Sequence, residues 1–170
     1  ANNTNSASDS TGAGGVFIGQ NSTLNMYEGA KISGNSGTGL SCMNNSHITI
    51  SGGTVTGNSS RRYAGGIVFS YTSANVSNLT VSNNVLLSTS TESWHVAGIY
   101  ATKSTINMTN CTITGNVSQA TNNADDAGAI WIYNYSNLTL DNCYIAENTS
   151  VKGVGGILTK STLLIKNCVV

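Results

Sequence analysis

The residues of this chain that could perform catalysis are few and scattered. Asp125 and Asp126 form the only adjacent pair of carboxylates, and hydrolysis of a polysaccharide requires two carboxyl groups on opposite sides of the scissile bond. His47 and His95 are predicted to lie on different elements, and neither has an aspartate at the same repeat position. We therefore predict no catalytic residues, and we expect Asp125 and Asp126 to be solvated loop residues. A polysaccharide-acting enzyme is the third of three functions considered.

Four cysteines offer a second kind of chemistry. Their spacing matches no zinc-binding pattern, so we predict neither a metal site nor a cofactor. Three of them, Cys111, Cys143 and Cys168, fall at one repeat position. A secretory route would permit disulfides between neighbouring repeats, but disulfide geometry is demanding. The favoured interpretation is that these thiols, with Cys42, pack as small apolar side chains.

Glycosylation is the third candidate chemistry. The motif Asn-x-Ser/Thr occurs twelve times in 170 residues, where composition predicts about six. The candidate acceptor sites are Asn21, Asn44, Asn75, Asn78, Asn107, Asn110, Asn134 and Asn137. Three of them, Asn75, Asn107 and Asn137, alternate with apolar residues and should point away from a core, so we expect an extracellular glycoprotein.

A repeat of 23 to 32 residues organises the whole chain. Six repeats open near Gly15, Gly39, Gly66, Gly98, Ala129 and Gly156. Each opening is followed by three short segments in which apolar and polar residues alternate, as in strands with one buried face. No helical pattern separates these segments. The sequence therefore predicts an all-β right-handed parallel β-helix, with residues 1–170 forming about six three-stranded coils as a single unit.

Polar residues recur at fixed positions between the predicted strands. A serine or threonine precedes the second segment of each repeat, at Ser22, Ser46, Thr72, Ser104, Ser136 and Ser161. An asparagine closes each repeat, and the set comprises Asn3, Asn35, Asn58, Asn84, Asn116 and Asn148. Stacked amides can bond from coil to coil. We therefore predict a structural asparagine ladder.

Two outward-facing patterns are candidate interaction surfaces. Outward positions of the first strand form an apolar stripe comprising Phe17, Val68, Tyr100, Trp131 and Leu158. This stripe could stack on sugar rings or pack against neighbouring filaments; alternatively, the long loops, especially residues 85–97, fold over it. Outward positions of the third strand carry Thr-x-Thr pairs such as Thr54/Thr56 and Thr112/Thr114. These resemble the ice-binding face of antifreeze β-helices, although threonine is also a common exposed strand residue.

The loops and openings of the repeats carry a family resemblance. The segments VTGN…AGGI, VSNN…AGI, ITGN…AGAI and IAEN…GGIL resemble the polymorphic outer membrane proteins of chlamydiae and related adhesin-type β-helices. The resemblance covers nearly the whole chain. It implies a secreted or surface-displayed adhesive solenoid and no catalytic residues.

The two ends of the sequence are complementary in repeat register. Joined end to start, the segment NCVV-ANN aligns with NCYIAEN inside the chain. We therefore expect a subunit junction formed by Ala1, Asn2, Asn3, Cys168, Val169 and Val170. Its expected product is a head-to-tail filament of copies or a tandem array, because a heterologous contact that does not close makes a filament.

Composition narrows the remaining functions. Charged residues make up 8% of the chain and the formal net charge is zero, so we predict no nucleic-acid partner. No apolar run approaches the roughly 20 residues of a membrane helix, so we predict no membrane insertion. The predicted function is that of an extracellular or cell-surface structural and adhesive protein. Its expected partners are copies of itself and, through the stripe, carbohydrate or lateral filament neighbours. An ice-binding protein is the alternative.

Overall fold

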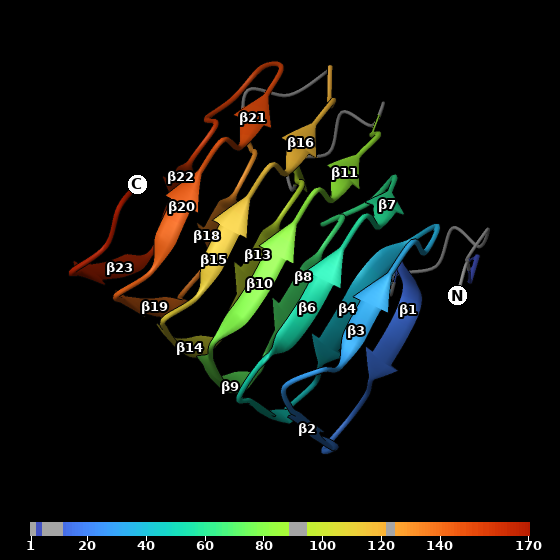
Figure 1. Ribbon diagram of the computed structural model, residues 1–170, viewed down its shortest axis with the longest axis vertical. Helices are drawn as coiled ribbons and strands as arrows, with labels where there is room; N and C mark the ends of the chain where they lie inside the picture. The colour runs from blue at the N-terminus through green and yellow to red at the C-terminus, as the bar shows by residue number, and fades with distance from the viewer. Residues whose placement is uncertain (1–2, 5–11, 89–94, 122–124) are drawn as a thin grey trace.

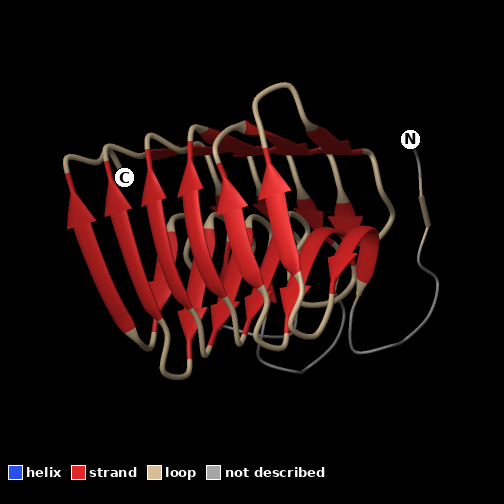
Figure 2. Cartoon of the chain, turned by 90° about the horizontal axis from the view of Figure 1, so that it is seen from below, coloured by secondary structure: helices blue, strands red, loops and turns tan. Residues whose placement is uncertain are grey.

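The computed structural model describes residues 3–4, 12–88, 95–121 and 125–170. Within these ranges the chain forms 23 strands and no helix, and every pair of neighbouring strands is parallel. The strands stack as successive coils of one column, with the two ends of the chain at opposite ends of the stack (Figure 1, Figure 2). The predicted parallel β-helix is confirmed.

Three large sheets make up the walls of the column. The first sheet contains β1 (Ala13–Ile18), β4 (Thr38–Met43), β8 (Ile67–Ser70), β13 (Ile99–Thr102), β18 (Ile130–Tyr133) and β22 (Ile157–Thr159). The second contains β2 (Thr23–Met26), β5 (His47–Ile50), β9 (Ser73–Ser77), β14 (Thr105–Thr109), β19 (Asn137–Asp141) and β23 (Thr162–Lys166). The third contains β3 (Lys31–Ser33), β6 (Gly53–Thr56), β10 (Leu79–Ser82), β15 (Thr112–Thr114) and β20 (Tyr144–Ala146).

Two smaller sheets were not predicted. A short sheet follows the third one and contains β7 (Ser59–Ser60), β11 (Val85–Leu86), β16 (Val117–Ser118) and β21 (Thr149–Ser150). The second small sheet pairs β12 (His95–Val96) with β17 (Asp126–Ala127). Single bridges from Ala64 to Val96 and from Ala127 to Val154 extend it to four coils. We call this set, Ala64, β12, β17 and Val154, the cover ladder.

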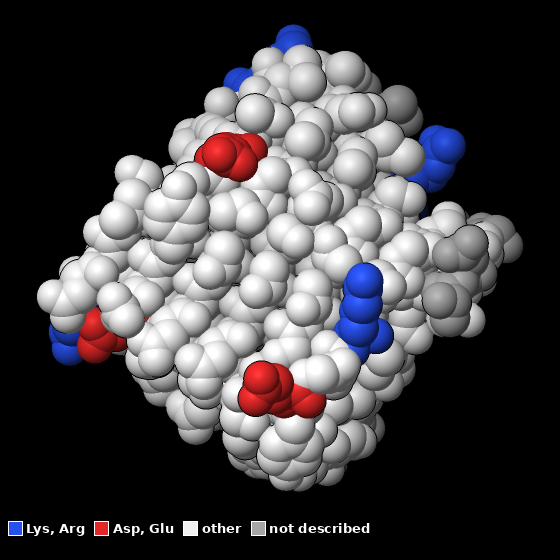
Figure 3. All heavy atoms as spheres, viewed as in Figure 1, with Lys and Arg blue, Asp and Glu red and all other residues white. Residues whose placement is uncertain are grey.

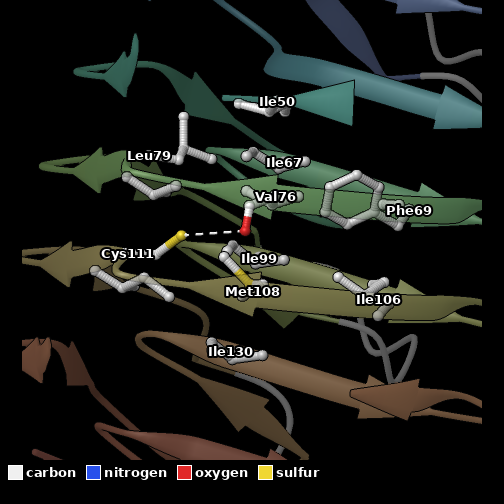
Figure 4. Packing of buried hydrophobic residues seen from close by; sticks show 14 of the residues in the cluster. Ile50, Ile67, Phe69, Val76, Leu79, Ile99, Ile106, Met108, Cys111 and Ile130 are labelled. Atoms are coloured by element: carbon white, nitrogen blue, oxygen red, sulfur yellow. Dashed lines mark hydrogen bonds between the residues drawn. The ribbon is translucent and has the colours of Figure 1, made fainter. Parts of the chain in front are cut away.

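The inward residues of the three large sheets form one continuous apolar core. Leu40, Ile67, Ile99 and Ile130 are stacked in the first sheet, and all are at most 1% exposed. Figure 4 shows how this core fills the space between the sheets. At the opening of the coils the backbones approach so closely that a Cβ on Gly98 would lie 2.2 Å from the carbonyl oxygen of Ala129. Glycine at this position is therefore a packing requirement.

The predicted asparagine ladder is present and is buried at its centre. Asn84 Nδ2 donates to Asn116 Oδ1 at 2.9 Å, and Asn116 Nδ2 donates to Asn148 Oδ1 at 2.8 Å. The backbone N–H of each also bonds to the next amide oxygen, at 3.1 Å for Asn84 and 3.0 Å for Asn116. Asn3 continues the ladder by donating to Asn35 at 3.0 Å. Each amide thus satisfies backbone groups that would otherwise be orphaned at the bend.

Two other bends use a left-handed backbone. The residue directly after four first-sheet strands has a φ between 47° and 56°, and we call this column the groove bend: Asn44, Tyr71, Lys103 and Asn134. The residue directly after four second-sheet strands has a φ between 51° and 54°, and we call this column the asparagine bend: Asn78, Asn110, Asn142 and Asn167. Asparagine tolerates this conformation better than most residues, and these two bends hold six of the 23 asparagines in the chain.

Part of the expected junction lies within the described residues. Val169 bridges to Tyr144, and its backbone N–H donates to the Cys143 carbonyl at 3.0 Å. Val169 and Val170 are exposed, whereas Cys168 is half-buried. Ala1 and Asn2 lie outside the described residues. A junction between copies therefore stays a prediction.

Candidate ligand-binding groove

The centre of the predicted apolar stripe is not exposed. Val68, Tyr100 and Trp131 are 1%, 4% and 0% exposed. They pack with Ala64, Val96 and Ala127 of the cover ladder in a second apolar cluster outside the first sheet. Of the two interpretations of the stripe, coverage by the loops is the correct one for these three residues, because a second ladder buries their apolar surface.

The ends of the stripe differ from its centre. Phe17 is 47% exposed and Leu158 is half-buried. A partner could therefore reach these two side chains directly. At the centre of the stripe, a partner could reach only the edge of the apolar cluster that the cover ladder buries.

A groove opens where the cover ladder stops. It has a volume of about 370 Å³ and crosses four successive coils. Its described lining consists of Met43, Asn44, Tyr63, Val68, Ser70, Tyr71, Tyr100, Thr102, Lys103, Tyr133 and Asn134. Because neighbouring parallel strands are about 4.8 Å apart, four coils span roughly 14 Å along the column axis. The groove therefore suits an elongated ligand lying parallel to that axis.

Aromatic rings form the walls and one end of the groove. Tyr63 stacks on Tyr100 with ring centroids 6.2 Å apart and planes inclined by 25°. Tyr100 meets Trp131 edge to face at 5.7 Å, and Trp131 is 5.7 Å from Tyr133. Burial raises the pKa of Tyr100 well above its usual range, so its hydroxyl stays protonated. These rings are fixed by contacts with one another before any ligand binds.

The four residues of the groove bend also line the groove. Tyr71 is 46% exposed, and Lys103 Nζ lies 4.6 Å from the centre of its ring. The same ammonium group also donates to the Tyr71 hydroxyl. Such a contact is a cation–π pair, and it holds an aromatic face and a positive charge side by side at the groove.

Backbone strain is concentrated around this groove. Among the described residues, five that are neither glycine nor asparagine have a positive φ: Tyr63, Tyr71, Lys103, Tyr135 and Glu147. Three of them line the groove, and Tyr135 lines the adjoining hollow beside Tyr133 and Lys160. A left-handed backbone costs bulky residues on the order of 1 kcal/mol. Strain of this kind clusters at functional sites.

The described side chains of the groove are mainly aromatic or polar and uncharged. Of the described residues that line it, none is Asp, Glu or His, and Lys103 is the single charged one. Hydroxyls and amides come from Ser70, Thr102 and Asn134. Tyrosine faces with a few hydroxyls and amides can hold a ring that has an apolar face and a polar edge. The carboxylate pair that glycoside hydrolysis requires is missing from this lining.

Two predictions are wrong. One is that Asp126 is a solvated loop residue, and the other is that His95 has no aspartate at the same repeat position. Asp126 is 0% exposed rather than solvated, and in the cover ladder it stands directly beside His95. Asp126 accepts hydrogen bonds from Ser118 and Ser150, each at 2.7 Å. Loss of water raises the pKa of its carboxyl group, while the two serine hydroxyls oppose this effect. The loop end is buried because it pairs as a strand, which the sequence pattern did not reveal.

The histidine beside Asp126 is also buried. His95 is 3% exposed, and its Nε2 lies 2.8 Å from the Oγ of Ser88, which is 1% exposed. A serine, a histidine and an aspartate thus lie in one region, and all three are buried. Asp125, by contrast, is half-buried and pairs with Lys160. Within the described residues no three His, Cys, Asp or Glu side chains are grouped to hold a metal ion.

The candidate glycosylation sites fall into two structural classes. Asn75, Asn107 and Asn137 point outward from the second sheet and are exposed, as predicted. The other five have a φ between 50° and 56°: Asn21, Asn44, Asn78, Asn110 and Asn134. The left-handed backbone is a sufficient reason for asparagine at these five positions. The excess of the motif therefore does not by itself require glycans.

Comparison with known proteins agrees with this architecture. A family model described as a right-handed β-helix region matches residues 1–121 and 66–170. The chain belongs to the right-handed β-helix family. No curated protein and no solved structure matches it significantly. This family includes polysaccharide-acting enzymes, and because a fold can support many functions, membership decides neither for nor against catalysis.

One feature of the sequence indicates the groove, although it did not enter the prediction. Where this β-helix has Asn44 and Asn134 after its first-sheet strands, the two coils between them have Tyr71 and Lys103. A break in an otherwise favourable turn position indicates that the side chain is needed for another reason. Tyr63 and Tyr133 carry no comparable signal in the sequence, because only the stacking of coils brings them to the groove.

Proposed function

We propose that this chain is a non-catalytic, extracellular adhesive β-helix that binds a carbohydrate chain in the groove. The observation that carries the proposal is the presence of Tyr63, Tyr71 and Lys103 in strained backbone conformations on the groove walls. A ladder of asparagines would be more stable there. The strain is explained if these side chains contact a ligand.

Carbohydrate fits the groove better than other ligand classes do. The aromatic faces of Tyr63 and Tyr71 can cover the apolar face of a sugar ring, while neighbouring hydroxyls and amides can bond its edge. One lysine is too little charge to hold a nucleic acid, which requires several phosphate contacts. A groove that runs along the coils can accommodate several consecutive sugar units. Binding rather than cleavage is proposed because the described lining residues include no carboxylate.

The decisive experiment replaces Tyr71 and Lys103 by asparagine, the residue found at this position in the coils on either side. The variant Tyr71→Asn/Lys103→Asn keeps a residue that tolerates a left-handed backbone. We expect the wild-type protein to bind at least one oligosaccharide on a glycan array, and the double variant to lose at least about tenfold in affinity by calorimetry, equivalent to about 1.4 kcal/mol.

A matched control comes from the other bend. Asn110→Gly alters an exposed residue of the asparagine bend, with the same backbone conformation and outside the groove lining, and it should leave binding unchanged. If the wild-type protein bound no glycan, or if the double variant bound as tightly, carbohydrate binding at this groove would be rejected.

Extracellular location and glycosylation complete the proposal. They are supported by the exposed acceptor sites on the second sheet, Asn75, Asn107 and Asn137. Intact-mass measurement before and after glycosidase treatment tests them on protein from its native source. An unchanged mass would remove glycosylation, and it would leave the groove proposal standing.

Filament assembly from copies of this chain is also part of the proposal. Its support is the one-dimensional construction, in which successive coils pair through the first two large sheets, and the first five coils also pair through the third. Electron microscopy of concentrated protein should show filaments about as wide as one column. Isolated particles at all concentrations would contradict assembly.

Ice binding is the alternative function, and one observation favours it. Thr54, Thr80 and Thr112 are in register on the third sheet, beside a second column formed by Thr56, Ser82 and Thr114. The face of the molecule that carries this sheet has few charged side chains, most of them near its margins (Figure 3). Thermal hysteresis measurements would reveal ice binding directly. The array covers only three strands, so we rank it second.

A further inference from the structure

Three cysteines form a continuous column inside the fourth, fifth and sixth coils. Cys111, Cys143 and Cys168 each directly follow an asparagine of the asparagine bend. The pairing of Thr112 with Tyr144, and of Tyr144 with Val169, places the three cysteines in register. All are free thiols. Cys42 lies apart from this column, on β4 of the first sheet.

The geometry places the sulfur of Cys168 against the fifth coil. The backbone N–H of Cys143 donates to Cys168 Sγ at 3.2 Å. In-register residues on neighbouring parallel strands have Cα atoms about 4.8 Å apart, within the range of roughly 4.4–6.8 Å that a disulfide can span. The predicted difficulty of disulfide geometry therefore concerns side-chain rotation and not separation.

The three thiols are chemically unequal. The interaction between the Cys111 and Cys143 side chains lowers the pKa of Cys143 and raises the pKa of Cys111. Cys111 also lies deep in the core, with its sulfur 3.9 Å from the Val76 carbonyl oxygen (Figure 4). Cys143 is 3% exposed and is the cysteine in direct contact with Cys168. Because the thiolate is the reactive form, this position together with the lowered pKa makes Cys143 the nucleophile of the column. Cys111 stays protonated and acts on Cys143 as a positioning residue.

We propose that Cys143 and Cys168 are an oxidation-sensitive dithiol that closes a disulfide between the fifth and sixth coils when it meets hydrogen peroxide. The Cys143 thiolate attacks one peroxide oxygen, the O–O bond breaks, and hydroxide leaves, giving a sulfenic acid. The Cys168 sulfur then attacks the Cys143 sulfur, its proton leaves with the sulfenic oxygen as water, and the S–S bond forms. Two thiols thus supply the two electrons that reduce one peroxide to two waters.

The closed disulfide would join coils that the chain otherwise connects through 25 residues. Its main effect is expected on the stability of the last two coils, since a cross-link removes freedom from the unfolded chain. We expect the melting temperature to rise by roughly 5–10 °C on oxidation. A thiol reductant should reverse the shift. This inference does not depend on the proposed groove function.

The test is oxidation of the folded protein with hydrogen peroxide, followed by alkylation and disulfide mapping by mass spectrometry. We expect a Cys143–Cys168 link as the main product. Cys42 should be recovered as a free thiol, because its neighbours in register are Ile18 and Phe69 and burial raises its pKa to about 12. Cys168→Ser should give no disulfide and a sulfenic acid on Cys143 that a dimedone probe traps. Cys42→Ser should behave as the wild-type protein.

Cys111→Ala tests the positioning role. It should still form the disulfide, with the pH at half-maximal rate moved upward because the donor that lowers the Cys143 pKa is removed. A Cys111–Cys143 link as the main product would overturn the proposal. So would thiols that remain unreacted with peroxide in a protein whose melting curve shows it to be folded.

Discussion

The groove bend and the asparagine bend have the same backbone and different side chains. Both place one residue per coil in the left-handed region directly after a strand. The asparagine bend is uniform from Asn78 to Asn167, and its exposed amides bond from coil to coil, as in the 2.7 Å contact from Asn142 to Asn110. The groove bend replaces asparagine with Tyr71 and Lys103 in its two middle coils.

This difference indicates where the fold serves something other than its own stability. Asparagine satisfies the backbone and its neighbours at little cost. Tyrosine and lysine in the same conformation are strained, and here they face a groove with other fixed tyrosines. A repeat protein makes such a comparison direct, because each coil is a control for the next.

The largest effect is expected from replacing an asparagine of the buried ladder. This replacement tests whether the side-chain amides, and not only the backbone conformation, stabilise the fold. Asn116 in the buried ladder accepts two hydrogen bonds from Asn84 and donates to Asn148 and Val81. Asn116→Ala should lower the free energy of unfolding by about 2–4 kcal/mol, because buried donors and acceptors lose their partners. Urea denaturation measures this cost. A loss below about 0.5 kcal/mol would show that the ladder contributes little.

The next prediction places a tyrosine, as found in the groove bend, at a position of the asparagine bend. Asn110→Tyr should lower the free energy of unfolding by about 1 kcal/mol, because a bulky residue acquires a left-handed backbone without any compensating contact. Asn110→Gly, which removes the strain entirely, should change it by only a few tenths of a kcal/mol. Equal denaturation midpoints for the two variants would contradict the strain argument.

The converse exchange should be stabilising or neutral. In Tyr71→Asn/Lys103→Asn the relief of strain is offset in part by loss of the cation–π contact. We expect the free energy of unfolding to rise by up to about 1 kcal/mol. Gained stability together with lost binding would identify these residues as functional. A clear loss of stability would instead show that they are there for packing.

The smallest expected effect concerns Asp126, in the cover ladder. Burial holds its pKa in the folded protein above the unfolded value, so the folded state binds the proton more tightly. Its contribution to stability is therefore fully present below the unfolded pKa, near 3.9, and is lost as the pH rises through the folded pKa. Thermal melts of Asp126→Asn should show a weaker decline with rising pH than the wild-type protein. Parallel pH profiles would contradict the assignment.

Most of the architecture could be predicted from periodicity. Alternation after Gly66 and Gly98 predicted the strands, and the recurrence of Asn84 and Asn116 predicted the ladder that closes each coil. The short sheet and the cover ladder were missed because two-residue strands leave no alternation to detect. For the same reason the sequence left open whether Trp131 is covered, since the residues that bury it, Val96 and Ala127, lie in two-residue strands.

The sequence by itself determined the coils, the inward columns and the side of each strand that faces the core, because these follow from a local period repeated in every coil. Only the tertiary structure decided which outward residues are covered, that His95 and Asp126 are neighbours, and that Tyr63, Tyr71 and Lys103 meet at one groove. Those relations depend on how loops of unequal length fold back over a sheet. The repeat pattern contains no information about that packing.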